Sequence, residues 1–345
     1  MTHETYMHRC FQLALLGAGH VAPNPMVGAV LVYNDRIIGE GYHQQYGQAH
    51  AEVNCINSVQ PADQHLVEKS TMYVSLEPCA HFGKTPPCAD LIIKRKIPSV
   101  VIGCSDSFKE VAGKGIQKLL DAGVNVTIPI LEQDAIELNR RFFTYHNQHR
   151  PYIILKWAQT ANRQIGNSDN SRLMITNELT NRKGHQWRSQ EASILVGTNT
   201  ALKDDPSLTN RLWTGTSPLR LVIDTGLKLP PHLHLFDGAQ KTIIFNFIEQ
   251  ADKGALLYQK ISAGEALVPQ LLSALYQLQV QSVLVEGGAK MLQSFIGADY
   301  WDEARVITNT ELLSAEGIAA PVLVNATLAS EERVGTDTIQ YFKHH

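Results

Sequence analysis

The chain contains 345 residues, of which 18% are charged, and its formal net charge is −3 at pH 7. This nearly balanced charge gives no indication of a nucleic-acid or membrane partner. The first residues lack a basic segment followed by an apolar core, and no apolar run reaches the ~18 residues that a membrane span needs. We therefore expect a cytoplasmic protein. A length above ~250–300 residues favours two domains.

The first half of the chain alternates strands and helices. An amphipathic helix is expected at the start, and residues 29–43 are typical of a hairpin that turns at Asn34–Asp35. A helix begins near His50. Further strands are expected over 70–79, 99–106 and 124–131, and further helices over 88–97 and 115–123. This order predicts a three-layer α/β/α domain with largely parallel strands.

A polar, basic stretch ends at Pro151, and we place the domain boundary in it, giving domains 1–147 and 148–345. The alternation then resumes. Strands are expected over 152–158, 193–197, 218–224, 241–247 and 282–288, and helices over 178–190 and 268–279. The C-terminal half is therefore predicted to be a second α/β domain.

His50, Cys79 and Cys88 have the side chains of a zinc site. One imidazole and two thiolates leave a fourth position open, as a hydrolytic zinc centre requires. Glu52 stands beside the histidine at the expected start of a helix. Two simpler interpretations remain: an exposed helix start that happens to be polar, or a structural zinc site with a fourth protein ligand, which would not need Glu52.

The pattern "HAE" followed by "PC…C" resembles the zinc nucleoside and nucleobase deaminases. Here the two cysteines are separated by "AHFGKTPP" instead of two residues. Together with "PNPMVGAVLV" and "GEGYHQQYGQAHAEV", that insert resembles the pyrimidine deaminase of riboflavin biosynthesis, the N-terminal half of a bifunctional deaminase–reductase family. A cytidine- or tRNA-type deaminase is the alternative, but it does not account for the insert or for the C-terminal half.

The resemblance implies a role for each matching position. His50, Cys79 and Cys88 would bind Zn²⁺, and Glu52 would be the catalytic residue that carries protons from water to the departing amino group. Asn24, His43, His81 and Lys84 would bind the substrate. Where the family has Asp-Pro-Asn-Pro, this chain reads "DSFK" at Asp106–Lys109.

In the second half, "VEGGAKMLQSF" is typical of a strand, a glycine turn and a helix that starts beside an anion, although a plain tight turn fits it as well. "SILVGTNTALKDDPSLTNR" resembles the reductase half of the same family, which is similar in fold to dihydrofolate reductase. NADPH would be the hydride donor. We expect positioning of substrate and cofactor here rather than a dedicated acid or base.

The resemblance also implies the reductase contacts. The cofactor-binding positions are Gln159, Met174, Thr200, Asp204, Thr225, Gly288, Ala289, Lys290, Met291, Leu292, Gln293 and Ser294. The substrate-binding positions are Ser171, Arg188, Leu208, Arg211 and Glu286. Taken singly, Met174 and Leu208 fit ordinary core packing, and Arg188 fits a solvated helix face. "SRLMIT" is one residue longer than the family pattern, which can shift the Ser171 assignment by one position.

The family resemblance covers nearly the whole chain and implies two consecutive reactions. The first is hydrolytic deamination of 2,5-diamino-6-(ribosylamino)pyrimidin-4-one 5′-phosphate, and the second is reduction of the ribosyl group to ribityl. A homo-oligomer, dimer or tetramer, is expected by the same resemblance. Because Asn162-Arg163 replaces the family's Asp-Gly, the alternative is an active deaminase joined to a weakened or specialised reductase.

Overall fold

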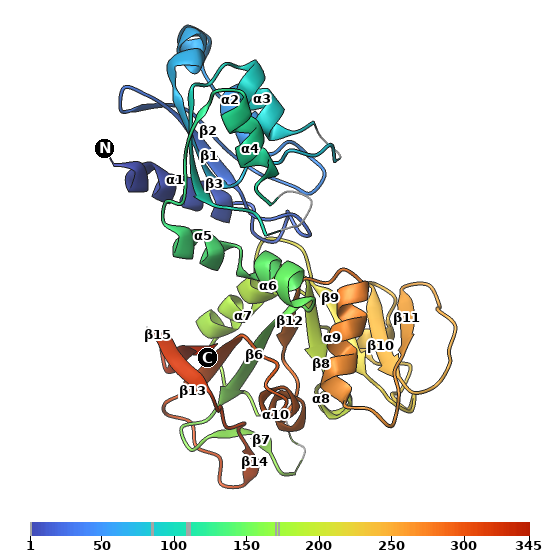
Figure 1. Ribbon diagram of the computed structural model, residues 1–345. Coiled ribbons are helices and arrows are strands. Elements are labelled where there is room, and N and C mark those ends of the chain that lie inside the picture. Colours follow the sequence, from blue (N-terminus) through green and yellow to red (C-terminus); the bar gives the residue numbers. More distant parts are fainter. Residues whose placement is uncertain (1, 84–85, 108–111, 170, 172) are drawn as a thin grey trace. The chain divides into compact units, whose positions relative to one another are not determined.

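Helices and strands alternate through two units of the chain, Met1–His149 and Arg150–His345 (Figure 1). The computed structural model describes residues 2–83, 86–107, 112–169, 171 and 173–345. Each unit has its own sheet and its own hydrophobic cores.

The N-terminal unit is built on a five-stranded sheet with the order β2-β1-β3-β4-β5. Its strands are β1 (Gly28–Tyr33), β2 (Arg36–Tyr42), β3 (Thr71–Leu76), β4 (Ser99–Cys104) and β5 (Asn125–Thr127). The expected hairpin is confirmed. Asn34 and Asp35 have φ values of 46° and 59°, as the turn of a two-residue hairpin requires.

Helices cover both faces of this sheet. They are α1 (His3–Leu15), α2 (Ala51–Asn57), the 3-10 helix η1 (Pro61–Lys69), α3 (Cys88–Lys94), α4 (Lys114–Asp121), α5 (Glu132–Leu138) and α6 (Arg140–Gln148). Side chains alternate along β1: Ala29 and Leu31 join the core with α2, α3 and α4, whereas Val30 and Val32 join the core with α1, α5 and α6. The three-layer prediction is confirmed.

Three details differ from the sequence expectations. β3 ends at Leu76 and not at Cys79, because Pro78 has no N–H to continue the ladder. β5 stops at Thr127, two residues before Pro129. Parallel pairing is limited to β3, β4 and β5, since β1 runs antiparallel to both of its neighbours.

The C-terminal unit has a nine-stranded sheet with the order β11-β10-β9-β8-β12-β6-β13-β16-β15. Its strands are β6 (Tyr152–Gln159), β8 (Ser193–Val196), β9 (Leu219–Ile223), β10 (Thr242–Asn246), β11 (Leu256–Lys260), β12 (Ser282–Val285), β13 (Glu303–Asn309), β15 (Ala326–Val334) and β16 (Asp337–His344). β7 (Gln164–Asn167) and β14 (Gly317–Ala319) form a separate two-stranded sheet. All five predicted strands of this half are present.

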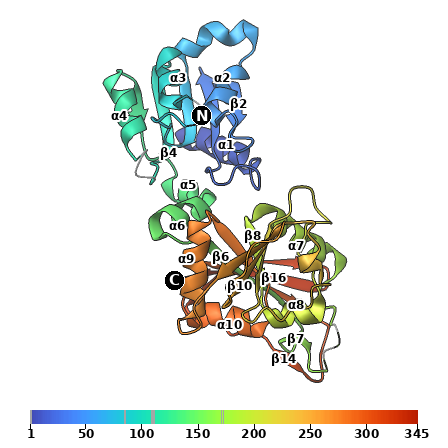
Figure 2. The same cartoon turned by 90° about the vertical axis from the view of Figure 1, so that its right-hand side faces the viewer.

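Helices again cover both faces, as Figure 2 shows: α9 (Leu267–Gln277) and α10 (Ala289–Gly297) lie on one face, and α7 (Glu178–Gln190) and α8 (Thr198–Asp204) on the other. Both predicted helices, α7 and α9, are confirmed. Asn177 caps α7 by accepting the N–H of Thr180 at 3.0 Å.

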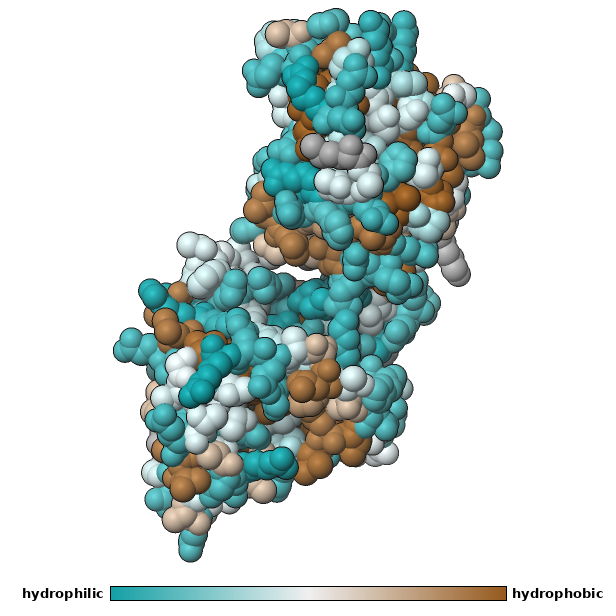
Figure 3. Space-filling model, turned by 90° about the vertical axis from the view of Figure 1, so that its left-hand side faces the viewer, coloured by the Kyte–Doolittle hydropathy of each residue, from teal (hydrophilic) through white to brown (hydrophobic). Residues whose placement is uncertain are grey.

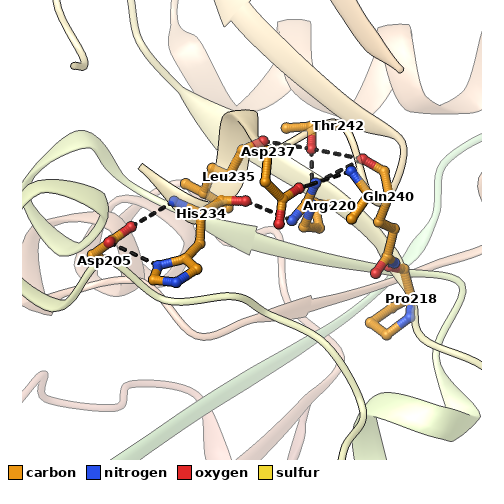
Figure 4. Close-up of polar contacts among 9 residues, drawn as sticks. Asp205, Pro218, Arg220, His234, Leu235, Asp237, Gln240 and Thr242 are labelled. Carbon is orange, nitrogen blue, oxygen red and sulfur yellow. Dashed lines mark hydrogen bonds and ion pairs between the residues drawn. The ribbon is translucent and has the colours of Figure 1, made fainter. Parts of the chain in front are cut away.

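A buried arginine holds the connection between β9 and β10, which contains the 3-10 helix η2 (His234–Phe236). Arg220 is 0% exposed and donates to the carbonyls of His234 and Gln240 and to the side chains of Asp237 and Thr242 (Figure 4). The His234 ring and N–H contact Asp205, at the end of α8. The Arg220 side chain therefore holds the backbone of the β9–β10 connection in place at several points.

On the face drawn in Figure 3, hydrophilic residues cover much of each unit and hydrophobic residues are interspersed among them. Such a mixture is normal for globular proteins. Among the described residues, no helix is both long enough and apolar enough to cross a membrane.

Candidate active sites

The three predicted zinc ligands come together in the N-terminal unit. His50 is the N-cap residue of α2, Cys88 is the first residue of α3, and Cys79 lies in the loop after β3. His50 Nδ1 is 3.5 Å from Cys79 Sγ and 3.4 Å from Cys88 Sγ. The three ligand atoms lie within 4.8 Å of one another.

This arrangement fits a tetrahedral zinc ion. With Zn–N near 2.0 Å and Zn–S near 2.3 Å, tetrahedral angles place nitrogen and sulfur about 3.5 Å apart. The N–S distances of 3.5 and 3.4 Å match that value. Within the described ranges no other group of His, Cys, Asp and Glu has metal-site spacing. Three protein ligands are the donor set of a catalytic rather than a structural zinc.

The sulfur atoms are held by local backbone structure as well. The N–H of Cys88 donates to Cys79 Sγ at 3.3 Å, and the N–H of Ala89 donates to the carbonyl of Cys79 at 3.1 Å. The contact with Cys88 lowers the pKa of the Cys79 thiol, and the same contact raises the pKa of Cys88. Without a metal ion, the contact between the two cysteines therefore favours ionisation of the Cys79 thiol over that of Cys88.

Glu52 lies in the first turn of α2 and is 3% exposed. Burial, followed by the nearby charge of Cys79, raises its pKa. A carboxyl group whose pKa is raised toward neutrality exchanges protons efficiently at physiological pH. A buried carboxyl group therefore lies close to the three ligand residues.

Two predicted substrate residues adjoin the same centre. His43 Nδ1 donates to the carbonyl of Ala49 at 3.1 Å, so in the neutral ring Nε2 accepts from Asn24 Nδ2, also at 3.1 Å. Burial lowers the pKa of His43, which favours that neutral ring. The rings of His43 and His50 are 5.2 Å apart.

The rest of the predicted substrate set belongs to the segment between the cysteines. His81 is exposed there. Lys84 lies outside the described residues, as do Phe108 and Lys109 of the "DSFK" segment. Their predicted contacts stay predictions.

In the C-terminal unit a charged cluster surrounds Glu286, which directly follows β12. Arg188 donates to both carboxylate oxygens, at 3.0 and 2.7 Å, and Lys156 Nζ lies 3.6 Å from Oε2. Burial raises the pKa of Glu286, but the two cations outweigh it and bring the pKa to about 2. Glu286 is therefore ionised. Lys156 was not predicted as a site residue, because a strand pattern alone does not distinguish it from any other strand lysine.

Arg211 is positioned through its backbone. Its N–H donates to Nδ1 of His185 at 3.0 Å, and its exposed side chain reaches Thr209 Oγ1 at 3.1 Å. Burial, with the charges of Arg188 and Arg211, lowers the pKa of His185 to about 4, so the ring is neutral and accepts this bond. His185 was not among the residues predicted from the sequence.

Part of the predicted cofactor set, namely Thr200, Thr225 and the 288–294 segment, follows the carboxyl ends of β8, β9 and β12. The N–H of Gly288 donates to Thr200 Oγ1 at 2.8 Å, which joins α8 to the start of α10. A Cβ on Gly287 would lie 2.9 Å from Met291 Cβ, so this turn needs glycine. The amides of Ala289 and Lys290 are in the first turn of α10. First-turn amides favour a phosphate, and this edge of a parallel sheet is where nucleotides bind.

The other predicted reductase residues lie on different elements and have different hydrogen-bond partners. Gln159 ends β6 and donates to Thr308, and the exposed Asp204 ends α8. Thr225 follows β9, and its carbonyl accepts the N–H of Phe247. Ser171 bonds to Asp169.

Met174 and Leu208 differ in the exposure of their side chains. Met174 is 66% exposed, which does not fit the simpler interpretation of core packing. Leu208 is 2% exposed and belongs to a core cluster.

Asn162 and Arg163, which replace the Asp-Gly of the family pattern, lie in a hydrogen-bonded turn. Asn162 accepts from Thr160 Oγ1 at 2.7 Å and donates to the carbonyl of Ser314 at 2.7 Å. Arg163 has φ of 59°, a conformation that suits glycine. The substitution therefore leaves a well-bonded turn with local strain at one residue.

These features are those of a zinc deaminase domain joined to an α/β domain that presents the first amides of α10 at the carboxyl edge of a parallel sheet. The comparisons with known proteins agree. Residues 1–104 match the cytidine and deoxycytidylate deaminase zinc-binding region, and residues 151–339 match the RibD C-terminal domain. The chain belongs to the RibD family of bifunctional deaminase–reductases of riboflavin biosynthesis.

Full-length relatives support this assignment. The riboflavin biosynthesis protein RibD of Aquifex aeolicus is 35% identical over 99% of this chain and 98% of its own length. That of Bacillus amyloliquefaciens is 38% identical over 94% of this chain and 86% of its own. The crystal structure of the deaminase/reductase from Thermotoga maritima matches with a TM-score of 0.90 and 33% identity, covering 99% of both chains. The predicted fold, a cytidine-deaminase-like domain followed by a dihydrofolate-reductase-like domain, is confirmed.

Proposed function

We propose that the chain catalyses two consecutive reactions on one pyrimidine ribotide. The deaminase unit hydrolyses the 2-amino group of 2,5-diamino-6-(ribosylamino)pyrimidin-4-one 5′-phosphate, and the reductase unit then reduces the ribosyl group to ribityl. The Thermotoga maritima relative is named for both activities, and it aligns along the whole chain. The observation that carries the deaminase step is the spacing of His50, Cys79 and Cys88 beside the buried Glu52.

In the deaminase unit each residue has a separate task. His50, Cys79 and Cys88 would hold the zinc ion, and the zinc would supply a water acidic enough to give a nucleophile at neutral pH. Glu52 accepts the proton of the attacking water and delivers it to the departing amino group, which leaves as ammonia. Its raised pKa suits both transfers.

Substrate recognition in this unit combines Asn24, His43, His81 and Lys84. The neutral His43 holds the Asn24 amide by accepting from its Nδ2, which leaves Oδ1 to receive a donor of the pyrimidine. Lys84 supplies a positive charge for the ribose phosphate.

In the reductase unit Arg211 is the better placed of the two arginines for the substrate phosphate. The Arg188 guanidinium is already bidentate to Glu286, whereas the exposed Arg211 side chain donates to the neutral Thr209 hydroxyl. The ionised Glu286 would accept hydrogen bonds from donor groups of the substrate. Ser171 and Leu208 complete the proposed substrate set.

NADPH supplies the hydride, whose chemistry belongs to the cofactor. The proposed contacts to it are Gln159, Met174, Thr200, Asp204, Thr225 and the 288–294 segment. The hydrogen bond between Gly288 and Thr200 orders the turn that presents the first amides of α10.

The test of the deaminase assignment is Glu52→Gln. We expect deamination to fall by ~10²–10⁴, because the side chain no longer carries a proton, while zinc remains bound. Ammonia release and zinc content per chain are measured together. NADPH-dependent reduction of the deaminated product is the internal control and should be unchanged. Deamination at the wild-type rate would refute the role of Glu52.

We further propose a homo-oligomer in the cytoplasm. All five cysteines are free, which suits a reducing compartment. Val322, Val324 and Leu328, at or near the edge strand β15, expose apolar side chains that suit a subunit contact. Analytical ultracentrifugation would show a dimer or tetramer, and a monomer at micromolar concentration would contradict this part of the proposal.

A further inference from the structure

Glu77 lies two residues before Cys79 and is 4% exposed. It directly follows β3, and its N–H donates to the carbonyl of Cys104 at the end of β4. The proposed deamination gives this side chain no direct role. A buried carboxylate is costly unless its oxygens are hydrogen-bonded, so its partners are informative.

Both oxygens of Glu77 accept backbone N–H groups from one other segment. Oε2 accepts from Asp106 at 3.2 Å and from Gly113 at 3.0 Å, and Oε1 accepts from Gly115 at 2.9 Å and from Ile116 at 3.2 Å. Asp106 and Gly113 stand near the two ends of the connection from β4 to α4. A single carboxylate oxygen therefore ties these ends together.

The same carboxylate caps α4. The N-cap residue of this helix is Gly113, which has no side chain to satisfy the first amides. Glu77 accepts those amides from outside the helix, and its negative charge is favourable at a helix N-terminus. The start of α4 is thus fixed to the end of β3.

A second contact joins α4 to the same short segment. A Cβ on Gly115 would lie 1.9 Å from the carbonyl oxygen of Pro78, so the helix backbone packs directly on the residue before Cys79. On the other side, Cys79 is held by the N–H groups of Cys88 and Ala89. The cysteine therefore sits between α3 and a strap formed by Glu77, Pro78 and α4.

We propose that Glu77 is a positioning residue of the zinc centre. It would set the place of Cys79 through the four hydrogen bonds that it accepts from the backbone N–H groups of residues 106, 113, 115 and 116. In this role it acts through the backbone and is not itself a zinc ligand. The inference rests on the proposed zinc function of His50, Cys79 and Cys88. Residues that orient metal ligands typically contribute 10–100-fold to metal affinity.

The experiment measures zinc affinity of the full chain by competition with a chelator, for wild type, Glu77→Gln and Gly115→Ala. Glutamine keeps the size of the side chain, but its amide group turns a donor toward N–H groups that need acceptors. The Cβ of Gly115→Ala would push α4 away from the Pro78 carbonyl without changing any charge. Glu68→Gln, at an exposed glutamate of η1, is the matched control.

We expect both strap variants to bind zinc 10–100-fold more weakly and the control to equal wild type. Hydrogen exchange should quicken at the amides of 113–116 while β3 and β4 stay protected, and deamination should return when zinc is raised to saturation. Unchanged zinc affinity would overturn the proposal. So would loss of protection throughout β3 and β4, which would make Glu77 a general folding residue. A wild type that binds no zinc would instead refute the proposed function itself.

Discussion

Arg163 stands where the reductase relatives, by the family pattern, have glycine, and its φ of 59° shows why glycine suits the position. The surrounding turn is intact, because Asn162 bonds to Thr160 and to Ser314. The departure identified in the sequence therefore affects local strain and leaves the turn geometry in place. This favours a working reductase over a silenced one.

Arg163→Gly should stabilise the reductase unit by about 1 kcal/mol, because glycine adopts positive φ without the Cβ clash. In a unit of this size that gain raises Tm by roughly 2–4 °C. Differential scanning calorimetry measures it. Arg163→Ala, which removes the side chain and keeps Cβ, should show no such gain, and an equal gain in both variants would contradict the explanation.

His185 gives the reductase unit a pH-dependent contribution to stability. Its pKa in the folded chain is about 4, lowered by burial and by Arg188 and Arg211 from an ordinary value of 6.5. The unfolded chain therefore takes up the proton first as the pH falls. The contribution is complete above pH 6.5 and is lost between pH 6.5 and about 4.

Comparison of wild type with His185→Gln isolates this effect. The Tm advantage of wild type should shrink steadily from pH 7 to pH 4, and the variant should also show a raised KM for the phosphorylated substrate of reduction, because Arg211 loses its backbone anchor. A Tm difference that stays constant over this range would show that His185 is not neutral in the folded chain.

At the scale of the elements, sequence patterns predicted most of what surrounds the sites. Periodicity located the hairpin, α2, α3 and the parallel strands of both units, and the metal ligands followed from their residue types. In the C-terminal half the strands β7, β11, β13, β14, β15 and β16 were missed. β15 is almost wholly exposed, so it lacks the alternation that marks a half-buried strand.

Contacts between segments that are distant in the chain could not be predicted from the sequence either. Lys156 and His185 look like ordinary polar residues until folding places them beside Glu286 and Arg211. The four bonds of Glu77 join segments separated by 29 to 39 residues. Such pairings depend on tertiary packing, which local patterns do not encode.

Arg220 provides the element-scale prediction. Arg220→Met should destabilise the reductase unit by about 3 kcal/mol or more, because the carbonyls of His234 and Gln240 and the side chain of Thr242 lose a buried donor. Urea denaturation monitored on this unit measures the change. Arg182→Met, at an exposed position of α7, is the control and should stay within about 0.5 kcal/mol of wild type. A loss as small as the control's would mean that water replaces these bonds.

At the scale of the whole molecule, the two units, Met1–His149 and Arg150–His345, carry separate cores and separate candidate sites. Zinc chemistry belongs to the first and hydride transfer to the second. Fusion of the two fits reactions that share one phosphorylated substrate skeleton. Each activity should therefore survive loss of the other, as the Glu52→Gln experiment requires.

The most direct test of this account follows both reactions in one sample. The purified, zinc-replete chain is mixed with the diaminopyrimidine ribotide and NADPH, and ammonia and NADPH are measured over time. We predict ammonia release first, followed by an equal molar loss of NADPH. Ammonia without NADPH loss would contradict the reductase assignment, and NADPH loss without ammonia would contradict the proposed order of the two steps.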